Sequence, residues 1–66
     1  MYQDALRSFR AGRVAEAVRL ASGIGEGRAD YQPAQLLLAE IAARQGRREA
    51  QRDHLLSALA AGRTDG

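Results

Sequence analysis

Residues 33–47 read PAQLLLAEIAARQGR, and this stretch decides the fold. Pro33 suits the first position of a helix, where its missing N–H has no intrahelical partner to lose. The apolar residues that follow cover most of a helix circumference, which is typical of a helix buried between neighbours. Gly46 then supplies the left-handed position that commonly ends a helix. We therefore expect a central, buried helix over residues 33–45.

Two local pairs support this assignment. With Pro33 at the first helical position, Tyr31 and Leu36 have the spacing of a hydrophobic staple across the helix start. Glu40 and Arg44 are four residues apart in the favourable order for an ion pair on the helix surface. The predicted helix thus has one narrow polar side.

Three more helices are expected on either side of this one, at about 2–11, 14–23 and 48–61. In the first, apolar residues recur at the helical spacing i, i+4, i+7. Alternate glycines mark a loop at about 24–32, because glycine loses the most backbone freedom in a helix. No strand-like alternation is found. The sequence therefore predicts a single all-α domain, 1–66, of four antiparallel helices with a frayed end at 63–66.

The chain also contains a repeated turn. A Gly-Arg pair occurs twice, at Gly12-Arg13 and Gly46-Arg47, and each pair lies between two predicted helices. Ala5 and Ala39 precede these glycines by seven residues. In these features the chain resembles the tetratricopeptide repeat (TPR) family, whose helix–turn–helix unit recurs at intervals of about 34 residues. The two Gly-Arg pairs are separated by that same interval. The bulky aromatic residues usual in that family are replaced by Met1, Ser8, Gln35 and Ala42.

The resemblance implies two stacked helical hairpins in a right-handed superhelix fragment. Repeat one spans about 1–31 and repeat two about 32–66. The alternative is a plain four-helix bundle with glycine turns. In TPR proteins the first helix of each pair lines a concave groove. The resemblance thus implies two sets of groove residues: Tyr2, Leu6, Phe9, Arg10 and Arg13 from repeat one, and Leu36, Glu40, Ala43, Arg44 and Arg47 from repeat two.

These arginines suggest the chemistry of a partner. Arg10 and Arg44 occupy equivalent positions, and guanidinium groups hold carboxylates by paired hydrogen bonds. An acidic peptide is the partner that such a groove would select. The alternative is that the arginines simply form a solvated face, and that the apolar residues of the first helix pack into the core.

The apolar pattern of the last helix predicts association with a partner. Packing on the central helix is expected to cover Leu55 and Leu59. Leu56 and Ala60 are turned away and would remain uncovered. An exposed apolar strip indicates a partner. We expect a homodimer, or docking onto a longer parent chain, through residues 52–61.

Residues for catalysis or metal binding are not grouped in the sequence. The chain has no cysteine and a single histidine, His54, which has no second ligand within helical reach and is expected to be structural. The glycine-rich loop follows a helix rather than a strand, so it does not match a phosphate-binding loop. We expect no enzymatic activity, no cofactor and no metal.

Composition places the remaining bounds on function. All ten basic residues are arginine, yet the net charge is only +2. Targeting and membrane-spanning patterns are absent, so a cytoplasmic location is expected. The predicted function is a non-enzymatic protein–protein interaction module. The alternatives are a small oligomerisation module and, more weakly, a nucleic-acid-binding domain that uses the arginines at the start of the last helix.

Overall fold

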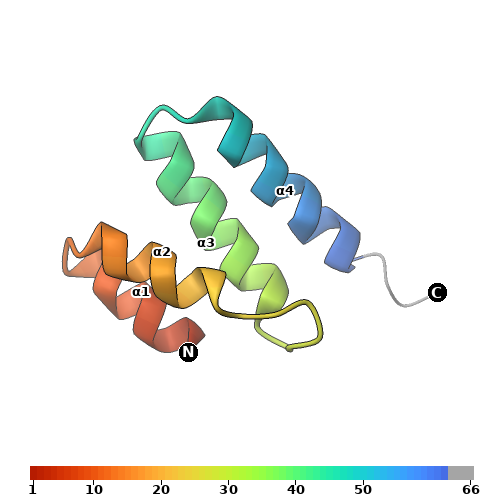
Figure 1. Ribbon diagram of the computed structural model, residues 1–66, viewed down its shortest axis with the longest axis horizontal. Helices are drawn as coiled ribbons and strands as arrows, with labels where there is room; N and C mark the ends of the chain where they lie inside the picture. Colours follow the sequence, from red (N-terminus) through yellow and green to blue (C-terminus); the bar gives the residue numbers. More distant parts are fainter. Residues whose placement is uncertain (63–66) are drawn as a thin grey trace.

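The computed structural model describes residues 1–62, which form four α-helices and no strand (Figure 1). The helices are α1 (Tyr2–Arg10), α2 (Val14–Ser22), α3 (Tyr31–Arg44) and α4 (Arg48–Gly62). The predicted all-α fold is confirmed over this range, and the predicted helix ends agree to within two residues. The prediction of a frayed end falls on residues 63–66, outside the described residues.

The turns after α1 and α3 have the same geometry. Gly12 and Gly46 have φ angles of +84° and +74°. In each turn the glycine N–H donates to the carbonyl three residues back, and the following N–H donates to the carbonyl five residues back. The N···O distances are 3.1 and 2.8 Å after α1, and 3.1 and 2.9 Å after α3. Both helices therefore end in the Schellman motif, and the predicted left-handed conformation of each glycine is confirmed.

The start of α3 differs from the prediction. Tyr31, rather than Pro33, is the first helical residue, and Asp30 flanks the helix. Pro33 is tolerated at the third position because the first four N–H groups of a helix have no intrahelical partner. Leu36 is 48% exposed, while Tyr31 packs against the core. The predicted staple between these two residues is therefore wrong.

The core is built around α3. Leu37, Leu38 and Ile41 are buried on this helix, together with the small residues that flank them. Facing them are the buried residues of the first two helices and of the following loop: Ala5, Ala17, Ala21 and Ile24. The small residues of α1 and α2 let these helices approach α3 closely, and the large residues of α3 fill the space between the helices. The prediction that α3 is the most buried helix is confirmed for the described residues.

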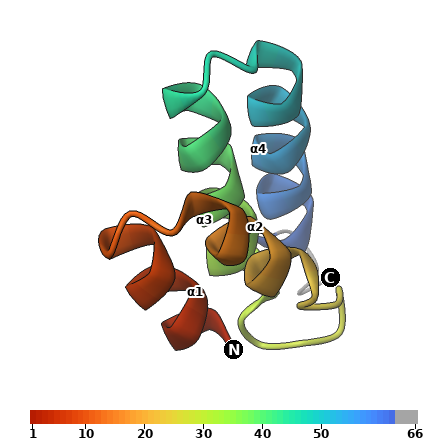
Figure 2. The ribbon, with the colours of Figure 1, turned by 60° about the vertical axis from the view of Figure 1, so that its left-hand side comes forward.

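The two hairpins are stacked in series. α3 packs against α2, more lightly against α1, and extensively against α4. Among the described helices, α4 contacts α3 alone. Figures 1 and 2 show α3 between the first hairpin and α4, with α4 on the far side from α1. A closed four-helix bundle would bring α4 against the first hairpin, so the arrangement is an open stack of hairpins.

The packing of α4 corrects one prediction. Leu55 and Leu59 were expected to be covered by α3, but they are 39% and 57% exposed. The face of α4 that meets α3 instead carries Ala58, which is 2% exposed, and half-buried His54. α4 is apolar on two adjacent faces, and the face that packs on α3 is the one on which His54 contacts Gln35.

Candidate partner-binding surface

The expected groove residues of α1 are partly in the core. Tyr2, Leu6 and Phe9 are half-buried and pack against the core cluster. They hold α1 on the molecule and present only part of their surface to solvent. The matching side chains of α3 are exposed: Leu36, Glu40, Ala43 and Arg44. The two helices thus contribute differently to any shared surface.

Arg44 links α1 and α3. Its guanidinium carbon lies 5.1 Å from the centroid of the Phe9 ring, and its Nη2 lies 3.1 Å from Oε2 of Glu40. The predicted pair of Glu40 and Arg44 is therefore present. Both charged side chains are more than half exposed, so the ion pair contributes little to stability. The contact with the ring places the positive charge over the junction of the two hairpins.

The other arginines expected in the groove have no such partner. Arg10, Arg13 and Arg47 are exposed and form no ion pair among the described residues. Arg10 matches Arg44 in the repeat, but no ring contact is found for it within residues 1–62. The structure therefore brings one predicted arginine into a tertiary contact and leaves three in solvent.

Each hairpin contains one polar contact between its helices. Ser8 Oγ donates to Oε2 of Glu16 at 2.8 Å, joining α1 to α2. His54 Nδ1 lies 2.7 Å from Oε1 of Gln35, joining α4 to α3. The amide oxygen accepts, so Nδ1 carries the proton. These two contacts were not predicted from the sequence, although Ser8 and Gln35 stand out as polar residues at positions where the resemblance to the TPR family leads one to expect aromatic ones.

An apolar surface remains uncovered on the second hairpin. Leu36 on α3 and Leu55 and Leu59 on α4 are 48%, 39% and 57% exposed. We call these three residues the leucine flank. Leu56 and Ala60 are also exposed and lie next to the flank on the outer side of α4, as predicted.

Helix geometry places the three leucines on one side of the hairpin. α3 and α4 are antiparallel and meet at Gln35 and His54. The next residue on each helix is turned by about 100°. Because the helices run in opposite directions, Leu36 and Leu55 turn to the same side. Leu59 follows Leu55 by one turn. This side is opposite to the one occupied by α2.

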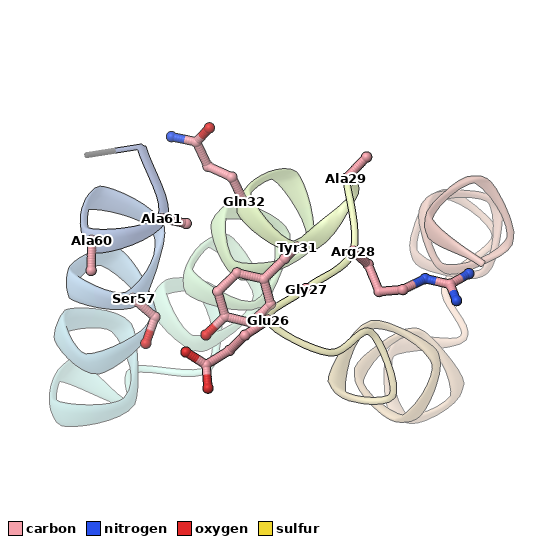
Figure 3. Close-up of a pocket in the computed structure, with 9 residues that line it drawn as sticks. All are labelled: Glu26, Gly27, Arg28, Ala29, Tyr31, Gln32, Ser57, Ala60 and Ala61. Atoms are coloured by element: carbon pink, nitrogen blue, oxygen red, sulfur yellow. The ribbon is translucent and has the colours of Figure 1, made fainter. Parts of the chain in front are cut away.

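A cleft lies between the loop that precedes α3 and the end of α4 (Figure 3). Its volume is about 560 Å³. Tyr31 and Glu26 extend toward Ser57 of α4, whereas Arg28 and Gln32 point away. The groups that converge are one carboxylate and two hydroxyls. They do not form a nucleophile with a base held beside it.

A second cleft, of about 290 Å³, lies between α2 and α4 over the second half of α3. Its floor is apolar, with Leu38 and Ile41, and His54 lies at its edge. The cleft exists because α2 and α4 do not touch and because Ala42 is small. It reflects the open stacking of the hairpins.

Within residues 1–62, no three His, Cys, Asp or Glu side chains gather as metal ligands. In the same range, every helix is too short or too polar to cross a membrane. Comparison with known proteins gave no match, whether to protein-family models, to curated proteins or to solved structures. The surface itself is therefore the basis for a functional assignment.

Proposed function

We propose that this chain is a non-enzymatic protein-interaction module, built like a pair of TPR units, that docks a helix on its leucine flank. The supporting features of the fold are the two glycine turns of matching geometry, one in each hairpin, and the buried alanines at matching positions, Ala5 and Ala39. A cytoplasmic location is part of this proposal.

The observation that carries the proposal is a comparison within the molecule. On the first hairpin, the side that bears Tyr2, Phe9 and Ala21 is the side on which α3 packs. In the repeat register that aligns Gly12 with Gly46, Tyr2 and Ala21 match Leu36 and Leu55 of the second hairpin. Ala21 is fully buried, whereas Leu55 is 39% exposed. A surface that receives a helix on one hairpin is thus apolar on the other, where no helix of the described residues covers it.

The size of the flank sets the strength of docking. A leucine that becomes fully buried contributes about 1.5–3 kcal/mol. From the exposed fractions of the three leucines, complete burial would contribute about 2–4 kcal/mol in total. Association also costs translational and rotational freedom. The flank alone therefore supports weak docking, and further contacts at its edge must add affinity.

The test uses a synthetic amphipathic peptide of about 18 residues, long enough to form a helix. Its leucines are spaced i, i+4, i+7 and its other residues are neutral. Addition of this neutral peptide should shift the backbone NMR signals around Leu36, Leu55 and Leu59. Leu59→Glu should abolish the shifts, because it places a charge in the contact. Gln3→Glu adds the same charge at an exposed position of α1 and should leave the peptide-induced shifts unchanged. Shifts that survive Leu59→Glu would contradict the proposal.

The second candidate is self-association through residues 52–61. Leu56, 55% exposed, favours it, because it extends the apolar surface beyond the flank to the outside of α4. A dimer about a two-fold axis would bury α4 against its copy. Light scattering should then give twice the monomer mass, and Leu56→Glu should return the mass to that of a monomer. A monomeric wild type at high concentration would exclude this candidate.

A further inference from the structure

The side of α4 that carries the leucine flank also carries two arginines. Arg48, Arg52, Leu55 and Leu59 are spaced by four, three and four residues, which places them in one stripe along the helix. The stripe is basic in its first half and apolar in its second. Arg48 and Arg52 are both exposed. This inference rests on the proposed docking of a helix at the flank.

The side chains of these two arginines are not paired with a carboxylate in the part of the chain that the structure describes. Glu49 and Asp53 follow them directly in sequence and are therefore turned about 100° away from the stripe. Glu40 lies on the same side of the hairpin, but its carboxylate is bound by Arg44. The edge of the flank thus carries a positive charge that the described residues leave unpaired.

A second copy of the chain does not supply the missing charge. α1 carries two basic residues in its last turn, Arg7 and Arg10, and one acidic residue in its first turn, Asp4. In an antiparallel pair of α4 helices, Arg48 and Arg52 would meet the end of the other α4, where residues 54–62 include no acidic residue. The chain as a whole has a net charge of +2. Self-association in this arrangement would therefore leave Arg48 and Arg52 without carboxylate partners.

From this charge pattern we infer that the partner is an acidic amphipathic helix of another protein. Its apolar residues cover Leu36, Leu55 and Leu59, and its carboxylates bind Arg48 and Arg52. Arg48 precedes Leu55 by seven residues, or about 10 Å along the axis. The carboxylate that binds Arg48 therefore lies about two turns from the central apolar contact of the partner helix, and the carboxylate that binds Arg52 lies about one turn from it. Guanidinium groups suit this role because they bind carboxylates through two parallel hydrogen bonds.

The test compares three peptides with the same leucine pattern. The first has glutamates beside the leucines at both ends, the second has glutamines there, and the third has lysines. At low salt we expect the glutamate peptide to bind about tenfold more tightly than the lysine peptide, as two exposed charge pairs allow. The difference should disappear near 1 M salt, where the Debye length is about 3 Å. Affinities are measured by fluorescence anisotropy.

Two variants with equal net charge test whether the preference for the glutamate peptide depends on Arg48 and Arg52. Arg48→Glu combined with Arg52→Glu should reverse the order of the peptides. Arg7→Glu combined with Arg19→Glu changes the charge equally on the exposed surface of the first hairpin and should preserve the order. Circular dichroism confirms that both variants are folded.

The outcomes separate the two proposals. Equal affinity for the glutamate and lysine peptides, with loss of binding in Leu59→Glu, overturns the acidic partner and leaves helix docking in place. Binding of none of the peptides, or binding unaffected by Leu59→Glu, overturns the proposed function itself. A dimer that the peptides fail to dissociate but that Leu59→Glu converts to a monomer shows that a second copy occupies the flank, and it overturns the acidic partner.

Discussion

The two hairpins differ most on matching faces of α1 and α3. The outer face of α1 carries Gln3, Asp4 and Arg7, all exposed. The matching positions of the second hairpin are leucine or isoleucine and are buried against the first hairpin: Leu37, Leu38 and Ile41. The same helical position is therefore polar where nothing covers it and apolar where a hairpin lies against it.

The opposite end of the stack does not follow this rule. The leucine flank is exposed and apolar, although no described residue covers it. The outer face of the first hairpin is polar, whereas the leucine flank of the second hairpin is apolar. This asymmetry is what directs the proposed partner to the second hairpin.

The largest expected effect tests the buried side of this comparison. Leu38 is 4% exposed, and its match in the first hairpin is exposed Asp4. Leu38→Ala should destabilise the protein by about 2–5 kcal/mol, since it empties a core site. That is comparable with the whole stability of a chain of this size, about 3–10 kcal/mol. Asp4→Ala should change stability by less than about 0.5 kcal/mol. Urea denaturation measures both changes in stability. Equal losses for Leu38→Ala and Asp4→Ala would contradict the difference between the two matching positions.

Much of this fold could be predicted because the signals are local. Gly12 and Gly46 end their helices through backbone geometry that depends on one residue each. The position of α4 depends on contacts distant in sequence. Leu55 and Leu59 lie on one apolar face and Ala58 lies on another, and the sequence pattern does not say which face meets α3. The contact between His54 and Gln35, 19 residues apart, accompanies the observed choice. The leucine flank was therefore predicted only in part: Leu36 was expected to line a groove, whereas Leu55 and Leu59 were expected to be buried.

The second prediction concerns two small residues at equivalent positions. Ala5 and Ala39 are 0% and 3% exposed. Ala5→Leu and Ala39→Leu should each cost about 1–3 kcal/mol, because a larger side chain has no space without displacing a helix. Ala43→Leu, on the exposed side of α3, is the control and should change stability by less than about 0.5 kcal/mol. If Ala39→Leu proved neutral, α3 and its neighbours would be less closely packed than the structure indicates.

Replacement of Gly12 or Gly46 by alanine should destabilise the protein by the same amount. A side chain added at Gly12 or Gly46 meets no atom within 4 Å, so the cost of Gly→Ala arises from the positive φ alone. We expect a loss of about 1 kcal/mol at each turn. Gly25→Ala, also in open space but without a positive φ, should be neutral or slightly stabilising. Thermal denaturation of the three variants compares them directly. Unequal losses at the two turns would show that the hairpins are less alike than their hydrogen bonds suggest.

The smallest effect separates the matching arginines of the two hairpins. Arg44 contacts the Phe9 ring and Glu40, whereas Arg10 makes neither kind of contact among the described residues. Arg44→Gln should cost about 0.5–1 kcal/mol, the usual range for an exposed cation over a ring together with a surface ion pair. Arg10→Gln should cost less than about 0.3 kcal/mol.

A double-mutant cycle with Phe9→Leu isolates the ring contact, because the leucine retains apolar packing but has no aromatic face. If Arg44→Gln costs less in the Phe9→Leu background, the ring contact contributes to holding α1 against α3. If its cost is the same in both backgrounds, Arg44 acts only through Glu40. In that case the half-buried apolar residues of α1, rather than this arginine, hold α1 in place.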